Sequence, residues 1–195
     1  MKIIMSLLIT ALYTVFVQNL VISSGLGMSE AIRASRRPGT FIRFAVMISG
    51  FSTATGFICA LLDKLSFTSS QPYIKAAVYG GILAAVYIIV AALSLAIFKA
   101  DKEFLGILGI AALNTLVYAV PYINSTAAYS VAESVGSGLG AGIAFVLAAA
   151  LIGSGSKILE ENEDIPDIFK GTPAMFMYVG LISLGFVGFT GTTIF

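Results

Sequence analysis

The 195-residue sequence contains no histidine, no tryptophan and a single cysteine, Cys59. These absences exclude imidazole ligation of haem or zinc, histidine-dependent acid–base catalysis and an intrachain disulfide framework. Charge is also scarce, since only 11% of the residues are charged and the formal net charge is +1. The chain therefore lacks both the polar surface that a soluble enzyme needs and the electrostatic field that would attract nucleic acid.

Long hydrophobic runs take the place of that polar surface. Hydrophobic residues make up 58% of the chain, and the mean hydropathy is +0.98. A helix needs about 20 mostly apolar residues to cross a bilayer, and the alternating pattern of a membrane barrel is missing. The sequence predicts an all-α integral membrane protein with one six-span domain over residues 1–195. The predicted spans are Ile3–Ile22, Phe41–Leu62, Tyr73–Phe98, Phe104–Ile123, Ala127–Ile152 and Pro173–Phe195.

Basic residues beside the spans predict the orientation of the chain. Six spans place both termini on one side of the membrane, together with Lys2, Lys64 and Lys75. The other side carries Arg33, Arg36, Arg37, Arg43, Lys99, Lys102, Lys157 and Lys170. Because cytoplasmic loops carry the excess of lysine and arginine, we expect both termini outside the cytoplasmic membrane of a prokaryote.

Polar residues and glycines interrupt the first and fourth spans. Gln18 and Asn19 lead into Gly25 and Gly27, and Asn114 lies in the middle of span 4. An unpaired carboxamide in hydrocarbon is costly, and irregular backbone is tolerated only where protein buries it. We expect spans 1 and 4 to be broken half-helices. They begin the two halves of the chain (about 1–100 and 101–195), which favours two inverted three-helix repeats. The alternative is a pair of unbroken helices joined by amide hydrogen bonds.

Span 5 carries the acidic residue that these boundaries place inside the membrane. Glu133 lies about two turns into Ala127–Ile152, so it is either a functional intramembrane carboxylate or, if the helix starts later, an interfacial one. Glycines at 136, 138, 140 and 142 follow it, and Gly188 continues the theme in span 6. The G-x-x-x-G spacing of Gly136 and Gly140 predicts close helix packing rather than a phosphate-binding loop.

Four motifs in a fixed order give the sequence a family resemblance. They are Gln18-Asn19-Leu20-Val21 with Gly25-Leu26-Gly27-Met28-Ser29, then Leu105-Gly106-Ile107 with Asn114-Thr115, then Ser130 to Gly140 with Glu133, and finally Phe169-Lys170-Gly171 with Gly185-Phe186-Val187-Gly188-Phe189-Thr190-Gly191. In this order, and within a six-span frame, the sequence resembles the membrane subunits of the Rnf and Nqr ion-translocating oxidoreductases, RnfA/NqrE and their relatives RnfE/NqrD.

The resemblance implies a partnership and a cofactor. In the family, two homologous six-span subunits of opposite topology hold a [2Fe–2S] cluster with cysteines from their broken helices. Electrons then pass between flavin-bearing or iron–sulfur subunits while Na⁺ or H⁺ is moved. The two cysteine positions read Ser29 and Thr115 here. Because neutral hydroxyls are poor cluster ligands, we expect no cofactor and no metal site from this chain alone.

Two classes of function stay open at this point. The first is a subunit of an Rnf/Nqr-like complex, not catalytic alone, in which Asn19 and Asn114 satisfy broken backbone and Glu133 offers a cation or proton site. Gln18, Gly25 and Gly27 would join that ion path. The alternative is a six-span component of a small-molecule transporter, of the vitamin-uptake substrate-binding type, or an assembly subunit without redox chemistry.

Overall fold

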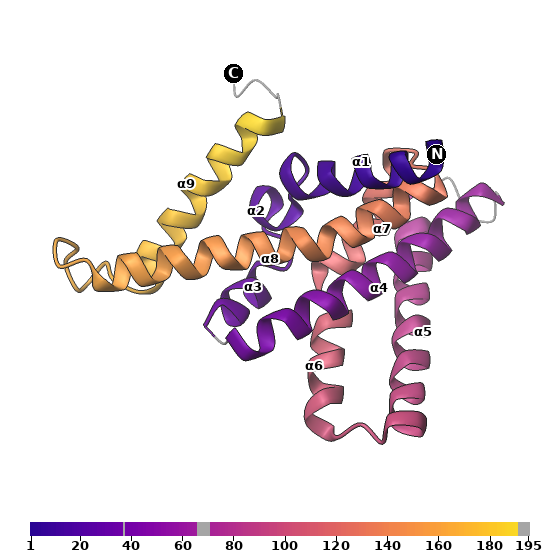
Figure 1. Cartoon of the computed structure of the whole chain (residues 1–195), viewed down its shortest axis with the longest axis horizontal. Coiled ribbons are helices and arrows are strands. Elements are labelled where there is room, and N and C mark those ends of the chain that lie inside the picture. The colour runs from indigo at the N-terminus through magenta and orange to yellow at the C-terminus, as the bar shows by residue number, and fades with distance from the viewer. Residues whose placement is uncertain (37, 66–70, 191–195) are drawn as a thin grey trace.

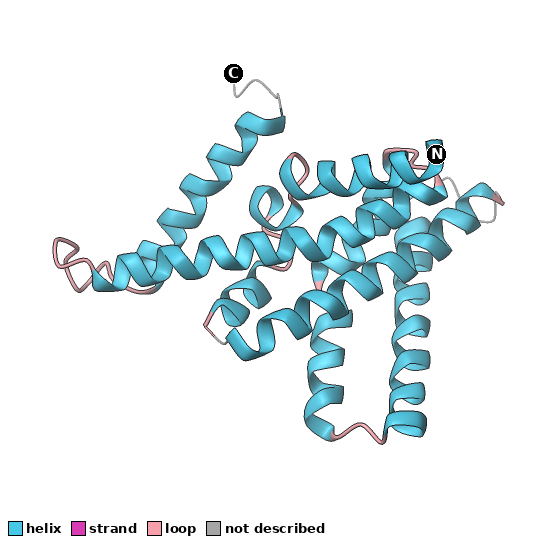
Figure 2. Ribbon diagram, in the orientation of Figure 1, coloured by secondary structure: helices cyan, strands magenta, loops and turns pink. Residues whose placement is uncertain are grey.

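The computed structural model describes residues 1–36, 38–65 and 71–190, and these residues form α-helices and no strand (Figures 1 and 2). The helices are α1 (Lys2–Phe16), α2 (Leu20–Ser24), α3 (Met28–Ser35), α4 (Pro38–Lys64), α5 (Pro72–Phe98), α6 (Lys102–Ala112), α7 (Thr115–Thr126), α8 (Val131–Glu161) and α9 (Thr172–Thr190). The predicted all-α class is confirmed for the described part of the chain.

Four helical stretches are long and apolar enough to cross a membrane. They are Phe41–Lys64, Pro72–Phe98, Lys102–Thr126 and Val131–Glu161, the third being the pair α6 and α7. Lys2–Phe16 and Thr172–Gly188 are shorter apolar helices. The first, short helix is what remains when the chain breaks after Phe16, before the predicted span Ile3–Ile22 is complete. Residues 191–195, at the end of the predicted sixth span, lie outside the described residues.

Apolar side chains cover the outside of the molecule, and many polar ones lie inside. On α5, for example, Ile88 and Ile89 are 63% and 58% exposed. The buried polar residues are Thr10, Thr14, Asn19, Ser52, Thr55, Ser94, Asn114, Asn124, Ser134 and Ser137. This distribution suits a protein surrounded by lipid, in which small residues and hydrogen bonds rather than hydrophobicity hold helices together.

Helix α8 lies between α1 and α4 and packs closely on both (Figure 1). Gly136 and Gly140 face α1: a Cβ added at Gly140 would lie 2.6 Å from the carbonyl oxygen of Ala11, and one added at Gly136 would clash with the Leu7 backbone. Gly136 and Gly140 are one turn apart, so they form one smooth strip on which the α1 backbone rests.

The next glycines along α8 face the other neighbour. A Cβ added at Gly138 would lie 2.5 Å from the Thr53 Cα, and one added at Gly142 would clash with Ser49, both on α4. Positions two residues apart point to opposite sides of a helix, since each residue turns the chain by about 100°. The alternating glycines therefore allow α8 to be approached closely from two sides at once.

The two halves of the chain pack across each other. Helix α1 contacts α8, and α6 contacts α4, so the broken helix of each half lies against the second helix of the other half. Likewise α2 contacts α9, α7 contacts α5, and α4 and α8 contact each other. Helices α5 and α6 form a hairpin that runs crosswise to α4 and α8 (Figure 1). Every contact of one half named here thus has a counterpart in the other.

Both predicted boundaries of the fifth span differ from the ends of its helix. Helix α8 begins at Val131 rather than near Ala127, and it runs to Glu161 rather than to Ile152. The reason is local: Ala128 has a left-handed φ of 53°, which ends the preceding helix, and Ser130 caps the new one. Glu133 therefore lies in the first turn of α8, and not two turns inside a span.

Candidate functional site

The first helix break lies between Phe16 and Leu20. Asn19 is fully buried there and caps α2, since its Oδ1 accepts a hydrogen bond from the backbone N–H of Ile22 at 3.2 Å. Its Nδ2 donates to the carbonyl oxygens of Val15, at 3.0 Å, and Ala144, at 3.4 Å. One side chain thus serves the end of α1, the start of α2 and the middle of α8. Gln18 beside it is half-buried, and its backbone N–H donates to the Tyr13 carbonyl.

Two glycines turn the chain after α2. Gly25 and Gly27 have left-handed φ angles of 69° and 75°, which other residues adopt only with strain. The N–H of Gly25 closes α2 by donating to the Leu20 carbonyl, and Gly27 stands at the start of α3. The pair therefore separates α2 from α3 by a tight turn.

The second break lies at Leu113 and Asn114, between α6 and α7. The Oδ1 of Asn114 accepts from the backbone N–H of Leu116 at 2.8 Å and so caps α7. The side chain is 3% exposed, and its Nδ2 has no hydrogen-bond partner among the described residues. Asn114 thus has the same capping role in the second half of the chain as Asn19 has in the first.

The two breaks meet. The backbone N–H of Gly27 donates to the hydroxyl oxygen of Thr115 at 3.0 Å, although 88 residues separate them. A Cβ added at Gly27 would lie 2.8 Å from the Asn114 Oδ1 and 3.2 Å from the Leu116 Cβ. The glycine is therefore needed both for its φ angle and for the close approach to α7.

Ser29 and Thr115, the two positions at which the resembled family has cluster cysteines, are both exposed on this chain. Their hydroxyls are already engaged: Ser29 donates to the Glu30 carboxylate at 2.7 Å, and Thr115 accepts from Gly27. No group of three histidine, cysteine, aspartate or glutamate residues that could hold a metal occurs within the described ranges. Cys59 is buried in α4. Neutral, hydrogen-bonded hydroxyls do not fit an iron–sulfur cluster.

Glu133 forms a capping box at the start of α8. Its carboxylate accepts from the backbone N–H of Ser130 at 2.7 Å, and the Ser130 hydroxyl accepts from the N–H of Glu133 at 3.4 Å. The hydroxyl of Ser6 on α1 donates to the same carboxylate at 3.0 Å. Glu133 therefore joins the first turn of α8 to α1.

Gly188 differs from the glycines of α8. A Cβ added there would meet nothing within 4 Å, so the helix contact predicted at this position is not made among the described residues. Gly188 is exposed on α9.

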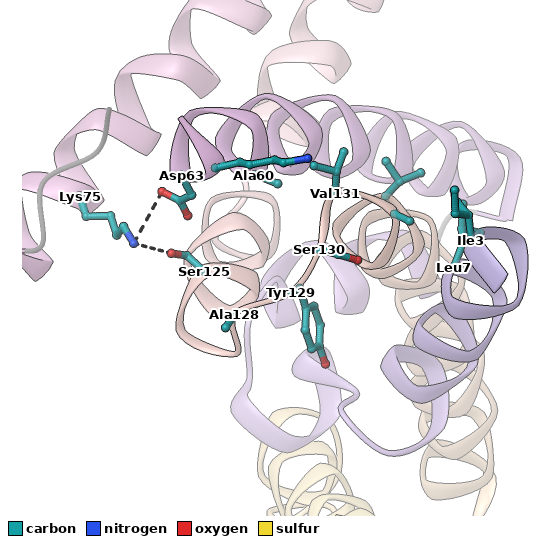
Figure 3. Close-up of a pocket in the computed structure, with 13 residues that line it drawn as sticks. Ile3, Leu7, Ala60, Asp63, Lys75, Ser125, Ala128, Tyr129, Ser130 and Val131 are labelled. Atoms are coloured by element: carbon teal, nitrogen blue, oxygen red, sulfur yellow. Dashed lines mark hydrogen bonds and ion pairs between the residues drawn. The ribbon is translucent and has the colours of Figure 1, made fainter. Parts of the chain in front are cut away.

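The structure adds a polar cluster that the sequence reasoning missed. Asp63, on the last turn of α4, accepts from the hydroxyl of the buried Tyr79 and lies 3.6 Å from the Lys75 ammonium. Lys75 also donates to the Ser125 hydroxyl at 2.6 Å. Figure 3 shows Asp63, Lys75 and Ser125 on one wall of a pocket of about 820 Å³, which Tyr129 also lines. The predicted span ended at Leu62, one residue before the carboxylate. The opposite charges of Asp63 and Lys75, at the two ends of one short connection, were the available signal.

Comparison with known proteins decides the family. The model of the family described as "Rnf-Nqr subunit, membrane protein" matches residues 7–193, almost the whole chain. The chain belongs to the Rnf-Nqr membrane subunit family. The Rnf-Nqr resemblance inferred from the order of the motifs is thereby confirmed, and the family is one of membrane proteins, in agreement with the apolar helices.

Individual relatives are similar over nearly their full length. The A-type subunit of the Na⁺-translocating ferredoxin:NAD⁺ oxidoreductase complex of Acetobacterium woodii is 26% identical, over 96% of this chain and 98% of the relative. The E-type subunit of the Na⁺-translocating NADH-quinone reductase of Pseudoalteromonas translucida is 28% identical, over 92% and 95%. The corresponding E-type subunit of Histophilus somni is 30% identical, over 91% and 93%. Both subunit types, RnfA and NqrE, are among those that the motif order had indicated.

Proposed function

We propose that this chain is a membrane subunit of an ion-translocating electron-transport complex, and that it contributes a scaffold and an ion path but no cluster ligands. The Rnf-Nqr match over residues 7–193 carries this proposal, because relatives of similar length are the A-type and E-type subunits of such complexes. The chain takes part in the complex through partner subunits that bear flavin or iron–sulfur groups, one of them a homologous six-span subunit of opposite topology.

The proposed architecture has six spans in two inverted repeats, about 1–100 and 101–195. The cross-packing of the halves supports it: α1 lies on α8 as α6 lies on α4, and α2 lies on α9 as α7 lies on α5. Asn19 and Asn114 cap the second piece of each broken helix in the same manner. Exchange of the two halves preserves these four contacts and the capping, which supports an inverted repeat.

The ion path of this proposal follows the helix breaks. Asn19, Gly27 and Asn114 hold non-helical backbone in the protein interior, where it is shielded from lipid, and Gly25 forms the exposed turn beside them. Gln18 and Glu133 lie at the margins of the same path. Na⁺ or H⁺ is the translocated ion, and both termini lie outside the cytoplasmic membrane of a prokaryote.

Iron analysis tests the proposal that this chain supplies no ligands to an iron–sulfur cluster. The purified chain, alone and together with its partner subunits, is examined by iron quantification and electron paramagnetic resonance. We expect no stoichiometric [2Fe–2S] signal from the chain alone. A stoichiometric signal that disappears in Ser29→Ala or Thr115→Ala would overturn this part of the proposal.

Purification of the complex tests subunit membership separately. An affinity-tagged chain expressed in its own host should bring down a homologous membrane protein and a second partner with bound flavin or an iron–sulfur group. Recovery of the chain with an ATPase pair instead would favour the small-molecule transporter. Reporter fusions at the two termini test the predicted topology.

A further inference from the structure

A small polar cavity lies directly behind the Asp63 cluster. Its volume is about 10 Å³, close to the space that one water molecule needs. The lining residues are Gly56, Ala60, Asp63, Pro121, Asn124, Ser125, Tyr129 and Ser134, from α4, α7, the connection after it and α8. Ala60, Asp63, Ser125 and Tyr129 also line the wide pocket of Figure 3, so the cavity adjoins the floor of that pocket.

Two oxygen atoms at this cavity have no hydrogen-bond partner in the part of the chain that the structure describes. Asn124 is 3% and Ser134 is 1% exposed, yet the Asn124 Oδ1 and the Ser134 Oγ form no hydrogen bond among the described residues. The orientation of the Asn124 amide is explained by its Nδ2, which lies 3.5 Å from the Ser134 carbonyl and donates to it. A buried polar atom without a partner is costly and calls for a water or an ion.

The charges around the cavity favour a monovalent cation. Asp63 supplies one carboxylate, and no group of three acidic, histidine or cysteine side chains that would suit a divalent metal lies within residues 1–36, 38–65 and 71–190. The ammonium of Lys75 lies 3.6 Å from Asp63 and also reaches Ser125, so a cation of the same single charge can take its place beside the carboxylate. A small cation that binds Asp63 would release Lys75 into the wide pocket, and the carboxylate would keep one positive charge beside it.

We propose that Asp63, Asn124 and Ser134 form a Na⁺ site in which the ion and the Lys75 ammonium exchange. The ligands are the Asp63 carboxylate, the Asn124 amide oxygen and the Ser134 hydroxyl, and hard cations prefer such oxygen atoms. Tyr79 holds the carboxylate in place from the side of α5. The site lies at the end of α4 that shares its side of the membrane with the chain termini, so ions exchange there with the outside. The inference rests on the proposed function, which supplies the reason for an ion to visit this chain.

Thermal unfolding of the purified full chain tests the site without redox partners. NaCl is titrated against choline chloride at constant ionic strength, and KCl serves as a second comparison. We expect the unfolding midpoint of the wild type to rise with Na⁺ concentration beyond the rise in choline, since a ligand stabilises the state that binds it. Coinciding Na⁺ and choline curves would overturn the proposal and leave membership of the complex untouched.

Two variants that should change the Na⁺ affinity in opposite directions distinguish an ion site from a structural ion pair. Asp63→Asn should weaken the apparent Na⁺ affinity at least about tenfold, because a unit charge beside the ion is lost. Lys75→Gln should unfold more easily without Na⁺ but bind Na⁺ more tightly than the wild type, because the competing ammonium is gone. A merely structural pair predicts two destabilised variants with no Na⁺ response, which contradicts the site.

Ser134→Ala tests the ion site even if the variants at Asp63 and Lys75 fail to fold. It removes an oxygen that has no partner among the described residues, so the fold should lose little, while the Na⁺ affinity falls. Glu163→Gln, at an exposed loop carboxylate, is the matched control and should respond to Na⁺ as the wild type does. An unchanged Na⁺ affinity in Ser134→Ala would remove its hydroxyl from the site and overturn the ligand set.

Discussion

The backbone N–H of Gly27 lies 3.0 Å from the hydroxyl oxygen of Thr115, and this one hydrogen bond joins the helix breaks of the two halves of the chain. Thr115 occupies the position at which the resembled family has a cluster cysteine. The residue that would hold a cofactor in those relatives here holds the opposite break in place.

The Thr115 hydroxyl should be needed for stability. Thr115→Val keeps the shape of the side chain but leaves the Gly27 N–H unpaired, at a cost of about 1–3 kcal/mol in the free energy of unfolding. Thr115→Ser retains the hydroxyl and should lose much less. Reversible unfolding in detergent measures both variants. Equal losses for valine and serine would contradict a stabilising role for this hydrogen bond.

Gly27 and Gly25 form a matched pair of left-handed glycines. Gly25→Ala meets nothing within 4 Å, so it should cost only the strain of a left-handed alanine, about 1–2 kcal/mol. Gly27→Ala adds a clash with Asn114 and should destabilise the protein clearly more. The two unfolding midpoints, compared in one detergent, check this order, and the reverse order would mean that the breaks do not meet as described.

Close packing on α8 should make its glycines intolerant of a methyl group. Gly140→Ala forces a side chain into the α1 backbone and should cost about 1–3 kcal/mol or prevent assembly of the fold. Gly188→Ala, on the open face of α9, is the control and should change the stability of the isolated chain little. Expression level and the unfolding midpoint give the comparison; similar losses at both positions would speak against the α1–α8 contact.

Two substitutions at Glu133 distinguish the role of its charge from its role in capping α8. Glutamine serves in a capping box as glutamate does, so Glu133→Gln should fold normally, whereas Glu133→Ala should lose about 0.5–2 kcal/mol of stability. If the carboxylate belongs to the ion path, Glu133→Gln should also slow Na⁺- or H⁺-coupled turnover of the assembled complex. Coupled turnover at the wild-type rate, with normal expression, would limit Glu133 to its structural role.

Local features of the sequence were sufficient for the class of the protein and for the places where its helices break. Scarce charge and long apolar runs predict membrane helices, and a carboxamide followed by glycines within such a run predicts a break. Asn19 and Asn114 are helix caps for this reason. The start of α8 was misjudged because apolar residues from Ala127 onward continue the span, while the left-handed Ala128 and the cap at Ser130 interrupt it.

The amino-acid sequence by itself determined an all-helical membrane protein of the Rnf-Nqr kind without cluster cysteines, because composition and motif order are local properties. Only the tertiary structure decided that Gly27 meets Thr115, that alternate glycines of α8 face α1 and α4, and that Asp63 and Lys75 adjoin the unpaired oxygens of Asn124 and Ser134. Such contacts depend on how helices distant in the chain cross, and no periodicity within one helix specifies the partner that lies against it.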